Sequence, residues 1–337
     1  MHKITLIPGD GIGPAIVDAS VQVIEATGVK VDWDTRLAGM AAVEEHATPL
    51  PEETLESIRR TRVCLKGPLT TPVGGGYRSV NVTLRQTFNL YANVRPAMSF
   101  EGTSSPFRNV NLVTIRENTE GLYAGIEHFI KFGEEKIAAE SIAVITRQGS
   151  ERVVRFAFDY ARAANRKKVT LVHKANILKC TGGLFLEIGR DIAKEYPEID
   201  FDERIVDACC MQLVMKPEIF DVIVTTNLFG DILSDLAAGL IGGLGLTAGA
   251  NIGTDAAIFE AVHGSAPDIA DLGIANPTAM ILAASMMLEH LGEKEAAGRI
   301  ERAVRAVIRE GQILTPDLRK DSEFGTQQMT RAIIANL

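Results

Sequence analysis

Two aspartates stand four residues apart in a segment with a helical pattern, TTNLFGDILSDLAAGLIGGLG. Asp231 and Asp235 would share one face of that helix, because residues four apart lie one above the other. Like charges at this spacing repel weakly, and a helix-capping Asp231 with a solvated Asp235 is the alternative interpretation. Beside the apolar remainder of the segment, the pair favours a hard divalent cation, Mg²⁺ or Mn²⁺. Asp207, after another strand-like run, would complete a three-carboxylate site.

A second group of residues could bind an acid. Arg85 and Arg95 lie within one short stretch, and Arg116 follows the next apolar run. An arginine binds a carboxylate through two parallel hydrogen bonds, so several converging arginines suit a polycarboxylate. Ser79 and Asn81 add neutral hydrogen-bonding groups. Surface salt bridges are the alternative role for these arginines.

Tyr123, in RENTEGLYAG, and Lys174, in VHKANI, could donate and accept protons. Burial and neighbouring charges change the pKa of both side-chain types, although a packed core tyrosine is the alternative. With the arginines and the carboxylates, the two residues indicate metal-assisted proton or decarboxylation chemistry on a small organic acid.

The elements that position these side chains are predicted by the alternation of short β-branched runs with amphipathic stretches, which is typical of an α/β fold. Four runs in the middle of the chain end in polar residues, namely Arg116, Lys174, Asp207 and Asn227. Ligands of open α/β sheets bind beyond the carboxyl ends of the strands. Polar residues also collect wherever loops begin, but four in succession favour a site.

The segment ITLIPGDGIGP, residues 4–14, reads as a strand that enters a glycine-rich turn before a helix. Asp32 or Asp34 follows about 20 residues later, which nearly reproduces the dinucleotide-binding fingerprint. The alternative is a strand-to-helix turn that forms one wall of a cofactor cleft.

Composition excludes several classes of protein. The chain has 337 residues, 46% hydrophobic and 23% charged, which is ordinary for a globular protein with two domains. Its formal charge of −8 without a basic run excludes a nucleic-acid partner. The most apolar run is short and glycine-rich, so no membrane partner is expected. The four cysteines lack metal-binding spacing and are expected to be core thiols: Cys64, Cys180, Cys209 and Cys210.

Several long motifs occur in order along nearly the whole chain: IPGDGIGP, LYANVRP, IRENTEG, HKANI, VTTNLFGDILSDLAAGLIGGLG, GANIG and HGSAPDIADLGIANPTA. In these motifs the chain resembles the β-decarboxylating 2-hydroxyacid dehydrogenases, the family of the isocitrate, homoisocitrate and 3-isopropylmalate dehydrogenases. The resemblance implies a non-Rossmann fold of two α/β domains with a cleft between them. Residues 1–95 and 242–337 would form a large cofactor-binding domain, and residues 96–241 a small domain with the metal site and the dimer interface.

The resemblance also implies a role for each matching residue. Arg85, Arg95 and Arg116 would bind the malate-like carboxylates, with Ser79 and Asn81 beside them. Tyr123 would protonate the enolate left after CO₂ departs, and Lys174 would act in proton transfer from the substrate hydroxyl. Asp207, Asp231 and Asp235 would bind Mg²⁺ or Mn²⁺. Lys174 and Asp207 would come from the neighbouring subunit, which implies a homodimer with shared active sites.

The cofactor implied is NAD. An acid at Asp268 would hydrogen-bond the ribose hydroxyls, whereas NADP-dependent relatives carry lysine and tyrosine at the positions of Asp268 and Ile269; a carboxylate there would also repel a 2′-phosphate. The cofactor-binding residues expected are Thr71, Asn227, His263, Gly264, Ser265, Ala266, Asp268, Ile269 and Asn276. Asp32 and Asp34 then lose the ribose role.

The resemblance favours isocitrate as the substrate, oxidised and decarboxylated to 2-oxoglutarate in the tricarboxylic acid cycle. Ser79 matches the serine that bonds the distal carboxylate of isocitrate, whereas an isopropyl group would need an apolar residue. Arg78 keeps homoisocitrate open, because homoisocitrate dehydrogenases use an additional arginine. A non-catalytic regulatory paralogue is the hypothesis of another class, but such subunits typically lose catalytic residues that this chain retains.

Three positions depart from the family pattern: Ala15, Ala208 and Asp271. None of the three is a proposed catalytic residue. The departures at Ala208 and Asp271 could change loops near the metal and the cofactor, so they affect the expected affinity for the cofactor rather than its identity. The chain lacks a signal or transit segment, so a bacterial cytoplasmic location is expected, or the mitochondrial matrix for a processed eukaryotic chain.

Overall fold

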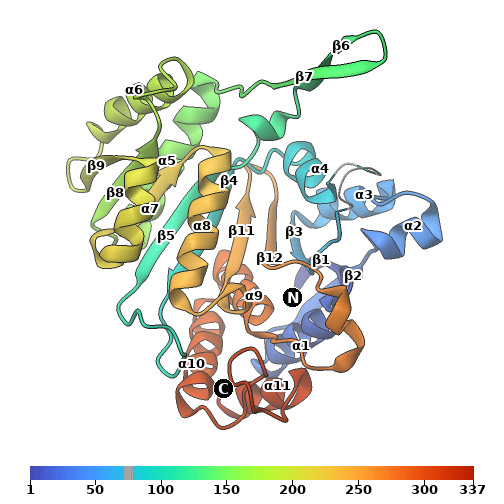
Figure 1. Ribbon diagram of the computed structural model, residues 1–337. Coiled ribbons are helices and arrows are strands. Elements are labelled where there is room, and N and C mark those ends of the chain that lie inside the picture. Colours follow the sequence, from blue (N-terminus) through green and yellow to red (C-terminus); the bar gives the residue numbers. More distant parts are fainter. Residues whose placement is uncertain (72–76, 78) are drawn as a thin grey trace. The chain divides into compact units, whose positions relative to one another are not determined.

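The computed structural model describes residues 1–71, 77 and 79–337 (Figure 1). The chain folds into two compact units. The first comprises residues 1–88, 98–110 and 238–337, and the second comprises residues 89–97 and 111–237. Each unit contains strands and helices, which confirms the α/β prediction. The domain boundaries expected from the sequence, and the roles given to the domains, stay a prediction.

The first unit has strands in the order β2-β1-β3-β12-β11. Neighbouring strands are parallel except for β11 and β12, which are antiparallel. Its elements are β1 (His2–Ile7), α1 (Gly13–Ala26), β2 (Val31–Thr35), α2 (Met40–His46), α3 (Glu52–Thr61), β3 (Val63–Lys66), α4 (Val80–Thr87), η3 (Leu244–Leu246), β11 (Ala248–Ile252), β12 (Ala257–Ala261), η4 (Pro267–Leu272), α9 (Thr278–His290), α10 (Lys294–Glu310) and α11 (Thr326–Ala335).

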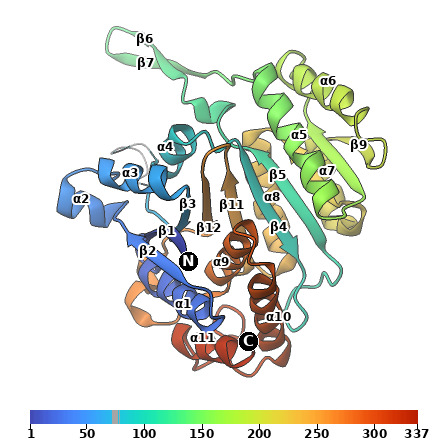
Figure 2. The same ribbon diagram turned by 180° about the vertical axis from the view of Figure 1, so that it is seen from behind.

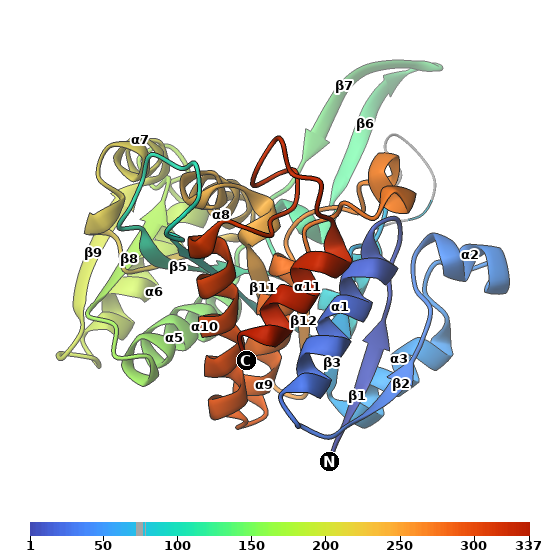
Figure 3. The ribbon, with the colours of Figure 1, turned by 90° about the horizontal axis from the view of Figure 1, so that it is seen from below.

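The core of the first unit lies between its sheet and helix α9. Most of α9 is buried, as expected for a helix that is apolar on all sides. It lies against β11 and β12 and is flanked by α1 and α10, and α11 contacts both of these helices (Figures 2 and 3). Helix α1 starts directly after the glycine-rich turn, with proline in its first turn, where proline costs no hydrogen bond.

The second unit has strands in the order β4-β5-β10-β8-β9, and a separate two-stranded sheet of β6 and β7. Its elements are β4 (Ala92–Met98), β5 (Asn111–Glu117), η1 (Leu122–Ala124), β6 (Glu127–Phe132), β7 (Glu135–Ser141), α5 (Arg147–Ala163), β8 (Lys168–His173), α6 (Thr181–Ala193), β9 (Asp200–Ile205), α7 (Val206–Met215), η2 (Pro217–Ile219) and β10 (Val222–Thr225). Helix α8 (Asn227–Ile241) begins in this unit and ends in the first.

The four runs with polar carboxyl ends are neighbouring parallel strands. β5 pairs with β10, β10 with β8, and β8 with β9. Arg116 lies at the end of β5 and Lys174 directly follows β8, whereas Asp207 belongs to the first turn of α7 and Asn227 is the first residue of α8. Because carboxyl ends of parallel strands meet at one edge, the topology brings these residues to one side of the second unit's sheet.

Strands β6 and β7 form an antiparallel hairpin that extends from the second unit (Figure 1). All of its residues are exposed, including Phe129, Phe132 and Ile137. A two-stranded hairpin is marginally stable alone, so its apolar side chains need a covering surface.

Two expectations about apolar segments can be compared with the structure. Among the described residues no helix is both long and apolar enough to cross a membrane. Cys64 and Cys209 are buried thiols as expected, and Cys210 is half-buried. The expectation is wrong for Cys180, which is exposed directly before α6.

Helix α6 packs against β8 through a glycine, which generates a stability prediction. A Cβ at Gly189 would lie 2.1 Å from Cδ1 of Leu171, a fully buried side chain. Gly189→Ala should therefore lower the free energy of unfolding by about 1–3 kcal/mol through overpacking. Gly183→Ala, in the same helix, meets nothing within 4 Å and should be neutral or slightly stabilising. Urea unfolding of both variants measures the difference, and equal stabilities would contradict this packing.

Candidate functional site

The carboxylate pair and two of the arginines lie together in the second unit. Arg116 is 1% exposed. Its Nε and Nη2 donate to Oδ1 of Asn227 at 2.9 and 2.8 Å, and its Nη1 donates to Asp231. A Cβ at Gly230 would lie 2.5 Å from Cγ of Arg116. The glycine in NLFGD therefore makes room for the arginine against α8.

Arg95, on β4, reaches the same face of α8. Its Nη1 donates to Ser234 Oγ at 2.6 Å and lies 3.3 Å from Asp235 Oδ1 and 3.5 Å from Asp231 Oδ1. The side chain is 8% exposed, and the groups that compensate its buried charge all belong to helix α8. Arg95, Arg116 and the two aspartates of α8 therefore lie together, whereas Arg85 pairs with Glu260 in the first unit.

Tyr123, in η1, completes this cluster. Its hydroxyl donates to Asp231, and the Arg116 guanidinium lies 5.0 Å from the centre of its ring. Burial and the hydrogen bond to Asp231 raise the pKa of Tyr123, and the charge of Arg116 opposes this shift. The tyrosine therefore keeps its proton at neutral pH, as a proton donor must.

The two aspartates of α8 suit a hard cation in part. Their side chains are 36% and 55% exposed, and carboxylate oxygens are the ligands that Mg²⁺ and Mn²⁺ prefer. Within the described residues of one chain, no three His, Cys, Asp or Glu side chains gather closely enough to hold a metal ion. The structure therefore does not bring Asp207 to Asp231 and Asp235 within one chain.

Asp207 lies instead beside Lys174. The Lys174 ammonium donates to Asp207, and this hydrogen bond lowers the pKa of the carboxyl. The predicted catalytic lysine and the predicted third metal ligand are thus neighbours, from the end of β8 and the start of α7. Tyr123 pairs with Asp231 and Lys174 with Asp207, so each proton-transfer residue has its own carboxylate partner.

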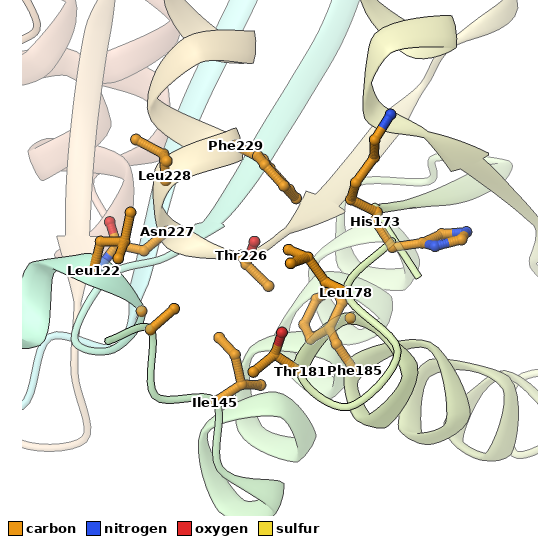
Figure 4. Close-up of a pocket in the computed structure, with 14 residues that line it drawn as sticks. Leu122, Ile145, His173, Leu178, Thr181, Phe185, Thr226, Asn227, Leu228 and Phe229 are labelled. Atoms are coloured by element: carbon orange, nitrogen blue, oxygen red, sulfur yellow. The ribbon is translucent and has the colours of Figure 1, made fainter. Parts of the chain in front are cut away.

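A small pocket lies next to Lys174 in the second unit. It encloses about 90 Å³ and includes Asn227 in its lining. Figure 4 shows apolar side chains around it, among them Leu122, Leu178 and Phe185. Lys174 and His173 contribute its basic groups, whereas Arg95 and Arg116 are not among the described residues that line it.

Arg85, on α4 of the first unit, lies in a buried charged network. Lys66 Nζ lies 2.6 Å from Glu260 Oε2, and Arg85 Nη2 lies 3.6 Å from Glu260 Oε1. Asn251 Nδ2 donates to the same carboxylate at 2.7 Å. Burial would raise the pKa of Glu260, but the charges of Lys66 and Arg85 and the hydrogen bonds lower it to about 2.

Polar atoms next to Arg85 are available to a ligand. Arg85 Nε and Asn81 Oδ1 are buried without a hydrogen-bond partner among the described residues. Ser79 directly precedes α4, and its hydroxyl lies 3.4 Å from that of Thr71. The predicted substrate residue and the predicted cofactor residue are therefore adjacent. Arg78, which would indicate homoisocitrate, lies outside the described residues.

The predicted cofactor loop follows β12. Ala266 adopts a left-handed conformation with φ 37°, which is uncommon outside glycine and is often found at functional sites. A Cβ at Gly264 would meet no atom within 4 Å, so the loop leaves space beside its backbone. Burial lowers the pKa of His263, although the Gly264 carbonyl opposes this. Asp268 is exposed at the start of η4.

Asn276, also predicted to bind the cofactor, donates to Asp317 Oδ2 at 2.9 Å and accepts from the backbone of Thr278. Asn227, in the second unit, uses its amide to hold Arg116 and also donates to the Glu120 carbonyl. Its cofactor role stays a prediction, as do the roles of the other site residues.

The aspartates of the apparent dinucleotide fingerprint have other partners. Asp34 accepts a hydrogen bond from Ser57 at 2.7 Å and pairs with Arg36 and Arg60. Asp32 lies 3.6 Å from Lys3 on the surface. Both belong to β2, at the edge of the sheet. Their positions and partners support the expectation that neither aspartate binds the ribose of a cofactor.

Sequence reasoning missed several residues that hold the site together. Glu260, which also pairs with Lys66, holds Arg85; Ser234 holds Arg95, and Asp317 holds Asn276. A charged residue inside the apolar runs VCLK and AIFEA was the available signal for the first two. The other two leave no such local signal.

Comparisons with known proteins show relatives along nearly the whole chain. The family model described as isocitrate/isopropylmalate dehydrogenase matches residues 3–333. The chain is 49% identical, over 99% of its length and 88% of the relative, to the mitochondrial NAD isocitrate dehydrogenase catalytic subunit 5 of Arabidopsis thaliana. It is also 49% identical, over 92% of its length and 86% of the relative, to the chloroplastic 3-isopropylmalate dehydrogenase of Solanum tuberosum.

A solved structure extends the likeness to the whole fold. The crystal structure of isocitrate dehydrogenase from Methylococcus capsulatus aligns with a TM-score of 0.98 and 79% identity. The alignment covers 100% of this chain and 99% of the other. The predicted fold is therefore confirmed.

The buried network around Arg85 generates a prediction about stability and pH. Because the folded-state pKa of Glu260 is about 2 against an ordinary 4.5, its ionised form stabilises the fold above its ordinary pKa. This contribution, about 3 kcal/mol, is lost as the pH falls from 4.5 towards 2. Glu260→Gln should abolish that pH dependence and, by leaving the Lys66 charge buried and unpaired, lower stability at neutral pH by about 3–5 kcal/mol.

Urea unfolding between about pH 7 and about pH 3 measures both effects. Glu56→Gln, at an exposed position of α3, is the matched control and should follow the wild type. A Glu260→Gln profile parallel to that of the wild type would contradict the assigned ion pair.

Proposed function

The chain belongs to the isocitrate/isopropylmalate dehydrogenase family, and from this premise we propose that it oxidises and decarboxylates isocitrate to 2-oxoglutarate with NAD and Mg²⁺ or Mn²⁺. The observation that carries the proposal is the cluster on α8. Two buried arginines and a protonated tyrosine meet two carboxylates there. A tricarboxylate substrate needs cationic groups, a bound cation needs oxygens, and the decarboxylated product needs a proton.

Substrate binding falls to the arginines. Arg95 and Arg116 are held rigidly by Ser234 and Asn227, so little side-chain entropy is lost when they bind an acid. In the first unit Arg85 has a buried Nε without a hydrogen-bond partner among the described residues, which a carboxylate could satisfy. Ser79 offers a hydroxyl to the distal carboxylate.

Substrate choice rests on the same serine. An isopropyl group would leave the hydroxyl of Ser79 without a partner, whereas a carboxylate accepts its hydrogen bond. Relatives named isocitrate dehydrogenase and 3-isopropylmalate dehydrogenase are both 49% identical to the chain, whereas the solved structure that is 79% identical is named isocitrate dehydrogenase. The polar character of Ser79 and Asn81 favours isocitrate.

Proton transfer falls to Tyr123 and Lys174. Lys174 donates to the Asp207 carboxylate; to take the proton of the substrate hydroxyl it would first pass its own proton on and act as the neutral amine, and NAD, when bound, would supply the hydride acceptor. Tyr123, whose pKa is raised, would then donate its proton to the carbon that CO₂ leaves. A divalent cation, held by Asp231 and Asp235 with Asp207 of a second subunit, would supply positive charge that favours this departure.

The residues around the cofactor loop fit NAD. The open backbone at Gly264 leaves room for a ligand, and the exposed Asp268 carboxylate could accept hydrogen bonds from ribose hydroxyls. The same charge would disfavour the phosphate of NADP. The other contacts with NAD expected in this unit would come from residues that include Thr71, His263 and Asn276.

A homodimer with shared sites is part of the proposal. Lys174 and Asp207 are paired with each other, away from Asp231 and Asp235 within one chain. Exposed apolar side chains of the same unit, on the hairpin and on α7, would be covered by a second copy; these are Phe129, Phe132, Ile137, Met211, Val214 and Met215. The cytoplasmic location expected from the sequence stays a prediction, and the Arabidopsis relative is mitochondrial by name.

Cofactor choice is tested with the double variant Asp268→Lys, Ile269→Tyr. With isocitrate and Mn²⁺, the wild type should reduce NAD in preference to NADP, and the variant should lose at least roughly tenfold of that preference. Asp271→Lys, with the same charge change in η4, is the control and should retain it. Steady-state kcat/KM for both cofactors is the measurement. An unchanged preference rejects the assigned loop, and a wild type that does not oxidise isocitrate rejects the proposed function.

The shared site is tested by mixing two inactive chains. Tyr123→Phe and Lys174→Met should each abolish turnover as homodimers. A heterodimer of the two, purified through two different tags, should recover about half of the wild-type activity, because one of its two sites then has both native residues. A heterodimer as inactive as its parents would show that each chain builds its own site.

A further inference from the structure

The glycine-rich turn that resembles a dinucleotide fingerprint contains a buried carboxylate, Asp10. It is 7% exposed, and its carboxylate accepts hydrogen bonds from Met40 and Thr70, neither of which is assigned to the reaction above. We propose that Asp10 is a positioning residue that holds the two loops from which NAD is bound. The inference rests on the proposed function and adds to it a group that acts through the protein backbone.

Both oxygens of Asp10 accept hydrogen bonds from backbone N–H groups of other loops. Oδ1 accepts from Met40 N at 2.8 Å, and Oδ2 accepts from Thr70 N at 2.7 Å. The Asp10 backbone N–H itself donates to the Pro68 carbonyl at 2.8 Å. Loop 67–71, which ends at the predicted cofactor residue Thr71, is therefore fixed to the turn at two points.

The turn is also hydrogen-bonded to the predicted cofactor loop, residues 263–266. Ile12 N donates to the Ser265 carbonyl at 2.9 Å, and a Cβ at Gly11 would lie 2.0 Å from that oxygen. The hydroxyls of Thr70 and Ser265 lie 2.7 Å apart. Thr70, whose N–H is held by Asp10, is thus the direct link between loop 67–71 and loop 263–266.

The carboxylate lies directly against the backbone of Gly39. A Cβ at Gly39, where φ is +79°, would lie 2.3 Å from Asp10 Oδ2. The Tyr77 hydroxyl donates to the Thr70 carbonyl at 3.0 Å, so the Thr70 peptide group is held on both sides. Gly39 therefore allows the approach of its loop to the carboxylate, and Gly9 and Gly11 allow the approach of the turn to the backbone of Pro68 and Ser265.

A carboxylate suits this position better than an amide does. Two N–H donors need two acceptor oxygens, whereas asparagine offers one oxygen and an NH₂ donor that would face an N–H. Asp10→Asn keeps the size of the side chain and removes one of the two bonds. Loop 67–71 or α2 would then lose its anchor, and contacts to NAD that depend on loop placement would weaken.

The test compares Asp10→Asn with Asp34→Asn. Asp34 is a hydrogen-bonded carboxylate of the same unit whose partners are Ser57, Arg36 and Arg60, none of which belongs to the two loops. NADH binding is measured by fluorescence titration, which needs no turnover, and each variant is first shown by circular dichroism to be folded at the temperature used. Asp10→Asn should bind NADH roughly tenfold more weakly and raise KM for NAD more than it lowers kcat, whereas Asp34→Asn should bind NADH like the wild type.

Thr70→Val is the second variant, because it removes the hydroxyl link to Ser265 and retains the backbone bond to Asp10. It should also weaken NADH binding, with the KM for isocitrate changed less. Wild-type affinity in both folded variants, Asp10→Asn and Thr70→Val, would overturn the positioning role and leave a structural role only. A wild-type protein that binds no NADH would instead reject the proposed cofactor, so the two failures are distinguishable.

Discussion

The burial of the Arg116 guanidinium against helix α8 is the constraint on which the candidate site depends. A buried charge needs hydrogen-bonding or charged partners, because burying it without them is very costly. Asn227 and Asp231 are the partners of Arg116. The glycine at position 230 lets the side chain approach the helix. Once Arg116 is fixed, Asp231 lies within reach of Arg95 and Tyr123. The site is therefore organised before any ligand binds, as a site for an acid and a cation should be.

The first unit solves the same problem with different residues. Arg85 is balanced by Glu260, which Lys66 and Asn251 also contact. In both units the arginine expected to bind substrate is thus held by a carboxylate inside the protein, so its position does not depend on substrate. The glycine-rich turn extends the principle to the cofactor, because the Asp10 carboxylate holds backbone rather than a charged side chain.

Much of the fold and part of the site could be predicted from local patterns. Alternating strands and helices, and the i, i+4 spacing of Asp231 and Asp235, depend on short-range periodicity, and the structure confirms them. Ser234 and Asp10 bond to residues far away in the sequence, so their roles could not be predicted from local spacing. The neighbourhood of Asp207 within one chain does not follow from spacing either, because the end of β9 is followed at once by α7, which places the carboxylate beside Lys174. The glycine-rich turn lies between β1 and α1 as expected, but its local pattern is the same whether a pyrophosphate or a carboxylate of the protein lies beside it, so the pattern alone does not identify a cofactor site.

The central claim is that one site performs both an oxidation and a decarboxylation of isocitrate. The most direct measurement is the stoichiometry of the reaction with purified protein, isocitrate, NAD and Mn²⁺, in which NADH, CO₂ and 2-oxoglutarate are each quantified. The account predicts equal amounts of all three products, and no reaction when the cation is removed with a chelator. NADH without an equal amount of CO₂, or faster turnover of 3-isopropylmalate than of isocitrate, would contradict it.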